Sequence, residues 1–114
     1  MHEMSIALNI TGIVNREMKK HDCRKLKSLS VRIGKLTALE PDALRFCFSA
    51  ITDGTGLEGA ELHIEEIPVR GKCEKCFSEF ELDLYFLTRC PQCGGKASGI
   101  ISGKELDVVS MEAE

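Results

Sequence analysis

The sequence has no tryptophan, and aromatic residues make up only 5% of its 114 residues. An excess of positive charge is also missing, because the formal net charge is −3 and the pI is about 5.7. An acidic chain with so few aromatic side chains is poorly suited to binding phosphate backbones. We therefore expect no nucleic acid among its partners.

Long hydrophobic runs are absent as well. No stretch of about 18 apolar residues occurs, so we expect no membrane span. The first five residues, Met-His-Glu-Met-Ser, lack the basic segment and the apolar core of a secretory signal. Hydrophobic and charged residues make up 43% and 29% of the chain, which is the balance of a globular protein. These features predict a cytoplasmic protein with reduced cysteines.

Four of the six cysteines form two Cys-x-x-Cys pairs, and thirteen residues separate the pairs. This spacing lets one tight turn direct two sulfur atoms at one ion, and two such turns complete a tetrahedron. Gly94 and Gly95 follow the second pair and allow the left-handed backbone angles that such a turn needs. Four thiolates leave no open position, so we expect structural Zn(II) rather than a catalytic metal. The predicted ligands are Cys73, Cys76, Cys90 and Cys93.

Three other interpretations of these cysteines stay open. Two disulfides would need an oxidising compartment, which nothing in the sequence indicates. A redox dithiol usually occurs as a single Cys-x-x-Cys and not as a facing pair. Iron is chemically acceptable, since rubredoxin-like sites share the Cys-Pro-x-Cys-Gly turn found at residues 90–94.

Two segments have the periodicity of amphipathic helices. Residues 4–20 place an apolar stripe along one side and end in Lys19 and Lys20, which suit a helix C-terminus. A second helix is predicted to begin at Pro41, beside acidic residues, and to end before the turn at 53–56. Both helices should bury one apolar face.

Strands are predicted in four places. Residues 27–34, 61–67 and 80–86 alternate between apolar and polar side chains, as half-exposed strands do. Residues 105–111 form a last, apolar-rich segment after the cysteines. A short final strand is best used by pairing with the earlier sheet.

These elements predict an α+β fold in which two helices pack on a small sheet of about three strands. The cysteine-rich segment is too short to bury an adequate core alone, so zinc would supply the missing stability, on the order of 10 kcal/mol or more. We therefore expect a zinc-ribbon-like lobe at residues 69–102. It would be inserted into an α/β domain formed by residues 1–68 and 103–114.

The N-terminus offers a second metal site. The Met1 amine, the deprotonated His2 amide and the His2 imidazole can close fused chelate rings around one ion in a nearly planar arrangement. Glu3 or another backbone nitrogen can supply the fourth donor. Planar N,O coordination suits Ni(II) or Cu(II), and binding should strengthen with rising pH because it releases protons. A histidine at position 2 is otherwise simply an exposed terminal residue.

The two ends of the chain together resemble the HypA/HybF family of nickel metallochaperones, which mature [NiFe] hydrogenase. The resemblance rests on the first five residues, on segments 34–36, 40–46 and 59–62, and on the paired Cys-x-x-Cys. It implies transient Ni(II) held by His2 and its neighbouring backbone, with Glu3 taking part in some members. It also implies that the four cysteines hold zinc in a separate lobe.

The resemblance further implies a transfer protein rather than an enzyme. Family members work with the GTPase HypB, which passes nickel to or through them, and they deliver nickel to the hydrogenase large subunit. In a few bacteria they also serve urease, so urease accessory proteins are further expected partners. A monomer and a homodimer are both compatible with the sequence.

One departure from the family is the absence of histidine from residues 64–114. Some relatives use histidines in or beside the zinc lobe, so a nickel-binding or pH-sensing histidine in that lobe is not expected here.

The alternative function is a zinc-ribbon module that binds nucleic acid or another protein. Its support is a group of basic residues near the cysteines, which we expect instead to offset the anionic metal–thiolate centre. They are Lys72, Lys75, Arg89 and Lys96. An enzyme has less support, because no open metal site, Ser/His/Asp set or phosphate-binding glycine loop is visible in the sequence.

Overall fold

The structure is a computed structural model, and it describes residues 2–83 and 88–114. The chain divides into two compact units. The first unit consists of Met1–Arg32, Leu39–Glu65 and Asp107–Glu114, and the second of Ile33–Ala38 and Glu66–Leu106. The domain limits expected from the sequence stay a prediction.

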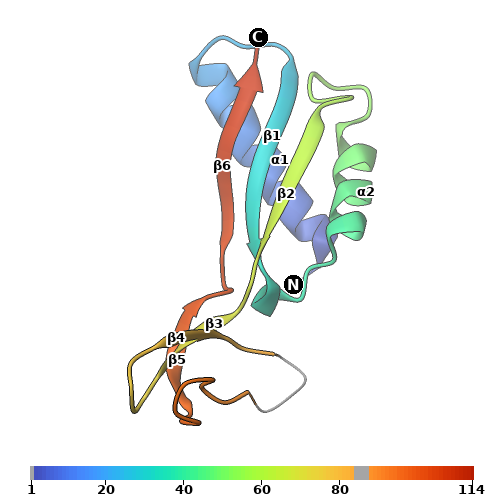
Figure 1. Cartoon of the computed structure of the whole chain (residues 1–114). Coiled ribbons are helices and arrows are strands. Elements are labelled where there is room, and N and C mark those ends of the chain that lie inside the picture. Colours follow the sequence, from blue (N-terminus) through green and yellow to red (C-terminus); the bar gives the residue numbers. More distant parts are fainter. Residues whose placement is uncertain (1, 84–87) are drawn as a thin grey trace. The chain divides into compact units, whose positions relative to one another are not determined.

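Helix α1 (Glu3–Lys20) opens the first unit and is amphipathic, as its sequence predicts (Figure 1). Ile6, Ile10 and Val14 follow one another at single-turn spacing and are at most 5% exposed. The first turn contains an acidic residue and the last turn two basic ones, which matches the helix dipole. One side of α1 is therefore committed to the core.

A three-stranded sheet supports the helices, and β1 (Leu26–Gly34) is its central strand. Its neighbours are β2 (Glu61–Ile67) and β6 (Leu106–Ala113). Lys25 and Glu114 exchange backbone hydrogen bonds of 2.8 and 2.9 Å where β1 begins and β6 ends. Such an exchange is the mark of antiparallel strands. The last strand thus pairs with the earlier sheet, as expected.

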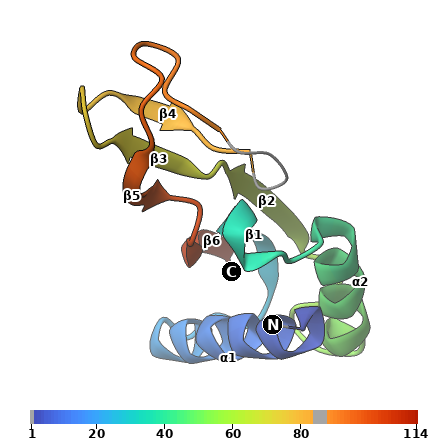
Figure 2. The same cartoon turned by 90° about the horizontal axis from the view of Figure 1, so that it is seen from below.

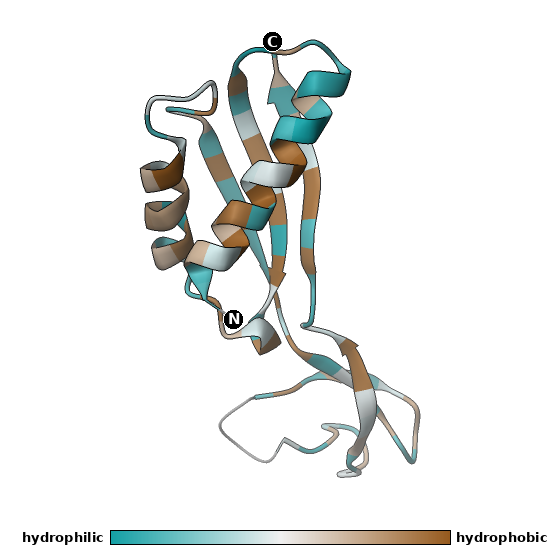
Figure 3. Ribbon diagram, turned by 180° about the vertical axis from the view of Figure 1, so that it is seen from behind, coloured by the Kyte–Doolittle hydropathy of each residue, from teal (hydrophilic) through white to brown (hydrophobic). Residues whose placement is uncertain are grey.

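Helix α2 (Pro41–Thr52) begins at the predicted proline. The Glu40 carboxylate caps it by accepting a 3.4 Å hydrogen bond from the N–H of Asp42. Leu44 and Phe48, one turn apart, are 0% and 3% exposed. Helices α1 and α2 lie on the same side of the sheet (Figures 1 and 3), so the predicted α+β fold is confirmed. Among the described residues, no helix is both long enough and apolar enough to cross a membrane.

The second unit contains its own three-stranded sheet, of strand order β4-β3-β5. Strand β3 (Arg70–Cys73) pairs antiparallel with both β4 (Glu79–Glu81) and β5 (Ala97–Ser102). Phe80 points inward from β4 and is 4% exposed. This small sheet carries the first cysteine at the end of its central strand.

A close backbone approach fixes the short 3-10 turn η1 (Lys35–Thr37) within the second unit. The N–H groups of Gly34 and Leu36 donate 2.8 Å hydrogen bonds to the carbonyls of Glu105 and Gly103. A Cβ atom on Gly34 would lie 2.0 Å from the Gly103 carbonyl oxygen. Only glycine therefore fits at position 34.

The strands of the second unit differ from those expected. The alternation at 80–86 predicts a strand of that length, and this is wrong, because β4 ends at Glu81. The N–H of Asp83 donates to the Thr88 hydroxyl at 2.9 Å instead of continuing a ladder. Residues 84–86 lie outside the described residues. Strands β3 and β5 were not expected, since neither shows a clear apolar–polar alternation.

Leu44→Ala should lower the free energy of unfolding by about 2–5 kcal/mol, because it leaves a cavity at a fully buried position. Urea unfolding followed by far-UV circular dichroism measures this loss. Phe46→Ala is the matched control, since Phe46 lies on the same helix but is 74% exposed. It should change the free energy by less than about 0.5 kcal/mol. Equal losses in the two variants would contradict the assignment of the buried face.

Candidate metal centre

The first Cys-x-x-Cys forms a tight turn at the end of β3. The N–H of Phe77 donates to the carbonyl of Cys73 at 3.1 Å, and the N–H of Cys73 donates to the carbonyl of Ser78 at 2.8 Å. Phe77 closes the turn with a φ of +63°, a left-handed conformation that costs a residue with a side chain about 1 kcal/mol. The turn is therefore closed at both ends by backbone hydrogen bonds.

The second Cys-x-x-Cys repeats this geometry. The N–H of Gly94 donates to the carbonyl of Cys90 at 2.8 Å, and the N–H of Cys90 donates to the carbonyl of Gly95 at 2.9 Å. Gly94 has a φ of +76°, as the sequence predicts for this position. A Cβ on Gly95 would lie 2.8 Å from the Cys73 sulfur, so this glycine makes room for the opposite turn.

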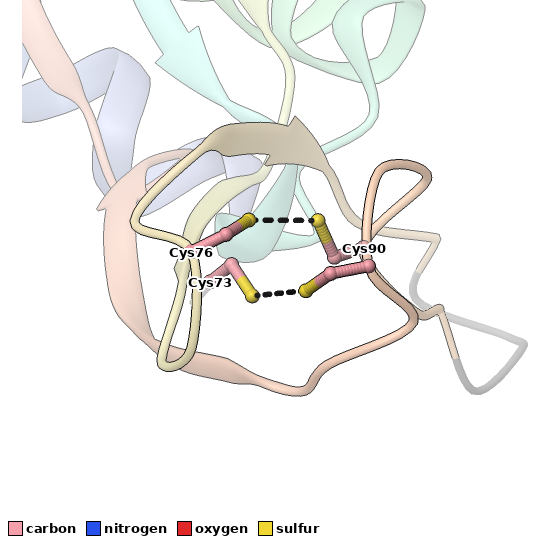
Figure 4. Close-up of side chains that lie close together, drawn as sticks. Cys73, Cys76 and Cys90 are labelled. Carbon is pink, nitrogen blue, oxygen red and sulfur yellow. Dashed lines mark hydrogen bonds between the residues drawn. The ribbon is translucent and has the colours of Figure 1, made fainter.

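The two turns bring four sulfur atoms together (Figure 4). All four lie within 4.8 Å of one another. The Sγ atoms of Cys73 and Cys93 are 3.4 Å apart, and those of Cys76 and Cys90 are 3.5 Å apart. A Zn–S distance of about 2.3 Å places tetrahedral ligand sulfurs about 3.8 Å apart. The four thiols therefore fit a single tetrahedral metal ion, and none of them is in a disulfide.

Burial divides the four ligands into two kinds. Cys73 and Cys90 are 0% and 3% exposed and pack with Phe80, whereas Cys76 and Cys93 are exposed. Leu82 and Ala97 complete the apolar side of this small core. The site is thus closed toward the protein and approachable from solvent, which suits a resident metal loaded from outside.

Hydrogen bonds prepare two of the thiols for metal. The backbone N–H of Cys76 holds the pKa of Cys73 below its ordinary value, despite the opposing effect of burial. The hydroxyl and the N–H of Ser78 lower the pKa of Cys76 to about 6. The Ser78 hydroxyl also lies 3.1 Å from Oε1 of Gln92, so its single proton is donated either to that oxygen or to the Cys76 sulfur at any one time. With its pKa lowered to about 6, Cys76 is largely a thiolate at neutral pH.

Cys93 behaves in the opposite way. The Gly95 N–H lowers its pKa, but the neighbouring thiols of Cys73 and Cys76, together with the partial loss of hydration of this exposed cysteine, outweigh that hydrogen bond and raise the pKa to about 11. Four thiolates so close together repel one another unless a cation lies between them. A divalent metal removes this repulsion, so metal binding and the last deprotonation occur together.

Two of the N-terminal residues predicted to bind metal, His2 and Glu3, lie at the start of α1. His2 is exposed and occupies the N-cap position, where its carbonyl accepts the Ile6 N–H at 3.2 Å. Within the described residues, its imidazole makes no capping hydrogen bond. Oε1 of Glu3 accepts a long hydrogen bond, 3.4 Å, from the N–H of Glu40. Met1, the third predicted donor, lies outside the described residues.

A family model described as "Hydrogenase/urease nickel incorporation, metallochaperone, hypA" matches residues 1–113. The chain belongs to the HypA family. It is therefore a nickel metallochaperone of hydrogenase and urease maturation with a four-cysteine metal site, and not an enzyme. The HypA assignment confirms the sequence-based prediction and favours the metallochaperone over a nucleic-acid-binding module.

Individual relatives agree with the HypA assignment. A hydrogenase maturation factor HypA from Desulfatibacillum aliphaticivorans is 45% identical over 98% of this chain and 86% of its own length. Another, from Chlorobium luteolum, is 40% identical over 97% of this chain and 94% of its own. The solution structure of the Ni metallochaperone HypA from Helicobacter pylori is 23% identical, with a TM-score of 0.64 over 99% of this chain and 97% of that chain. This last likeness concerns the fold.

Sequence inspection missed two residues, one beside the cysteine cluster and one beside the N-terminal residues predicted to bind nickel. Phe77 takes the left-handed position that a glycine takes in the second turn, and its place directly after Cys76 is the signal that could have revealed it. Glu40 both caps α2 and contacts Glu3, and no local pattern announces that contact because 37 residues separate them. The conformation of Phe77 could have been predicted from the motif, whereas the contact between Glu40 and Glu3 depends on the fold.

Gly95→Ala should weaken zinc binding by about tenfold or more, because the added methyl group would press on the Cys73 sulfur at 2.8 Å. Competition with a chromophoric chelator measures the affinity. Gly99→Ala is the matched control, since a Cβ there meets no atom within 4 Å. Equal zinc affinities for both variants and the native chain would show that the two turns do not approach each other in this way.

Zinc affinity should fall as the pH falls, and it should fall more steeply below about pH 6. Above pH 6 the Cys76 thiol is already ionised, whereas below it zinc must displace a proton from Cys76. The slope of log affinity against pH should increase by about one at this point. Ser78→Ala, which removes a hydrogen bond that lowers the Cys76 pKa, should move the change of slope to higher pH. A constant slope through pH 6 would contradict the lowered pKa.

Proposed function

We propose that this chain binds Ni(II) transiently at its N-terminus and transfers it during hydrogenase maturation, and during urease maturation where that enzyme is present. The observation that carries the proposal is the exposed His2 directly before α1, with the Glu3 carboxylate one residue away. A chelate at such a place can be reached by the ligands of a partner protein. Exchange of the metal then requires no opening of the fold.

The proposed nickel ligands are nitrogen and oxygen donors. They are the Met1 amine, the His2 amide nitrogen and imidazole, and the Glu3 carboxylate. A nearly planar set of this kind suits Ni(II). The hydrogen bond from the Glu40 N–H to one Glu3 oxygen supports the carboxylate at the start of α1. Glu40 is thus a positioning residue in this proposal.

Nickel release follows from the same chemistry. The His2 amide must lose its proton to bind nickel, and the imidazole must be neutral, so nickel affinity rises with pH. Return of a proton to either group loosens the chelate. Alternatively, ligands of a recipient replace those of the chain one at a time, which keeps the metal bound throughout the transfer.

The four cysteines are proposed to hold structural Zn(II). Thiolate sulfur is a soft ligand and the set of four is closed, so the bound metal is retained rather than passed on. Zinc joins the ends of two turns whose own apolar core is small. The two metals would therefore be separated by ligand type as well as by role.

The proposed partners are the GTPase HypB as nickel donor and the hydrogenase large subunit as recipient, with urease accessory proteins as further partners. The proposed place of action is the cytoplasm, where thiols stay reduced. The nickel-incorporation description of the family and the hydrogenase-maturation names of the relatives support the hydrogenase and urease assignments, whereas HypB is proposed from the resemblance of the sequence to the family.

His2→Ala should abolish the N-terminal nickel site while leaving fold and zinc content unchanged, because His2 is exposed and supplies donors only for nickel. Isothermal titration with Ni(II), on protein with an untagged native N-terminus, and elemental analysis measure both metals. His63→Ala is the matched control, since His63 is an exposed residue of β2 that pairs with Glu61 at 3.3 Å. The proposal fails if His2→Ala still binds nickel like the control or still supports hydrogenase maturation in cells.

A further inference from the structure

Strand β6 is an open edge of the first sheet. It pairs with β1 on one side, and on its other side it has no strand partner among residues 2–83 and 88–114. Such an edge presents a row of unpaired backbone N–H and C=O groups. These groups repeat at the spacing of a β-strand, so only another extended segment can pair with the whole row. The backbone of β6 thus specifies the conformation of an occupant.

The two edges of the first sheet are protected unequally. Strand β2, the other edge, has four ionisable residues among its seven, and charge along an edge discourages pairing. Strand β6 has eight residues, of which only Asp107 and Glu112 are ionisable, and it contains neither lysine nor proline. Val109, near its middle, is 56% exposed. The edge at β6 is therefore the one open to pairing.

A groove of about 510 Å³ lies between β6 and the C-terminal half of α1. The C-terminal end of α1 projects past the outer edge of β6 in Figures 1 and 2, so a strand added to this edge would lie against the helix. Apolar residues from both elements line the groove. They are Ile13, Val108, Val109, Met111 and Ala113. An added strand would thus find an apolar surface for its side chains beside the backbone of β6.

The charges beside the groove indicate the composition of its occupant. Asp107 and Glu112 are exposed, and neither forms an ion pair within the described part of the chain. Glu17 lines the groove from α1, 3.6 Å from Lys20 and 3.9 Å from His21. Opposite charges at facing positions stabilise strand pairing, and like charges weaken it. A strand with basic residues opposite Asp107 and Glu112 therefore fits.

A second copy of the chain fits this edge less well. Two β6 strands could pair antiparallel about a two-fold axis. In the register that overlaps residues 106–113 fully, Asp107 of each copy faces Glu112 of the other. Four carboxylates would then meet as two facing pairs, with no basic residue on either strand to balance them. The charge pattern thus favours a different protein as the occupant.

We propose that β6 and the groove beside it bind an extended segment of a partner protein, which adds a fourth strand to the first sheet. The segment would direct β-branched or other apolar residues toward α1 and place lysine or arginine opposite Asp107 and Glu112. Backbone hydrogen bonds to β6 would supply affinity, and the side chains would supply specificity.

This binding site is separate from the proposed nickel site. Glu17 and His2 are 15 residues apart on either side of most of α1, which corresponds to about 22 Å at 1.5 Å per residue. A partner strand on β6 therefore leaves the N-terminus open, and the inference does not depend on nickel binding at His2.

A synthetic peptide tests strand addition on the full-length chain with zinc bound. The peptide is Thr-Lys-Val-Thr-Thr-Val-Lys-Thr with both ends blocked. Its lysines have the five-residue spacing of Asp107 and Glu112, and it reads the same in both directions. We expect ¹⁵N chemical-shift changes and slowed amide exchange in β6, with a dissociation constant below about 1 mM.

A second peptide, with proline in place of the two central threonines, is the matched control. Proline removes two N–H donors and disfavours strand pairing, while the charge stays the same. The proline peptide should bind at least about tenfold more weakly. Equal binding of the two peptides would show that charge alone holds them, and would overturn the proposal.

Ile13→Lys in the full-length chain tests the groove. It places a positive charge where the basic peptide should lie, so the dissociation constant should rise by about tenfold. Leu8→Lys is the matched control, because Leu8 is a 55% exposed apolar residue of the same helix that does not line the groove. Circular dichroism should show the native helix content in both variants. Equal affinities of the two variants would place the peptide elsewhere and reject the groove.

Asp107→Asn combined with Glu112→Gln tests the charges. This double variant should bind the peptide about threefold to tenfold more weakly, and the salt dependence of binding should decrease. An unchanged affinity and salt dependence would contradict the charge argument that selects a basic partner.

Two other outcomes would also overturn the proposal. Absence of peptide binding at about 5 mM would reject strand addition. A dimer of the native chain in analytical ultracentrifugation, which Ile13→Lys dissociates, would assign the edge to a second copy. His2→Ala should bind the peptide as the native chain does, so failure of strand addition and failure of the proposed nickel site are distinguished.

Discussion

Burial of one face of β1 is the constraint on which the first unit depends. Leu29 and Val31, which alternate onto that face, are at most 2% exposed, and each contributes about 1.5–3 kcal/mol through removal from water. Because β1 is the central strand, both neighbouring strands and both helices are arranged around it. Packing on this side brings the start of α1 to the start of α2, where Glu3 meets the N–H of Glu40. The chemistry proposed at the N-terminus thus takes its position from the core.

Around the cysteines of the second unit, a small hydrophobic cluster and the metal site are the same structure. Two of the three buried residues of this cluster, Cys73 and Cys90, also belong to the group of four cysteines that could hold a metal. So small a cluster offsets little of the conformational entropy of the loops around it, which a metal would help to balance. Burial and soft ligands suit the retention of a metal there, whereas exposure and mixed donors at the proposed His2 site would favour exchange.

Local motifs were informative where the physics is local. The Cys-x-x-Cys spacing, Gly94 with its positive φ, and Pro41 at a helix start each describe a few neighbouring residues, and the structure has them as expected. Alternation failed at residues 80–86, because it cannot show that the Asp83 N–H finds the Thr88 hydroxyl. It also missed β5, whose Ile100 and Ile101 are adjacent and both at least 40% exposed.

The sequence by itself determined the two helices, the three strands of the first sheet, the cysteine cluster and the family. These depend on side-chain type, turn spacing and periodicity, which are properties of short stretches of chain. Only the tertiary structure decided that Glu40 contacts Glu3 and that Phe46, rather than Leu44 or Phe48, is left in solvent. The apolar pattern of α2 is compatible with several faces, and the choice between them is made by the sheet and helix that pack against it.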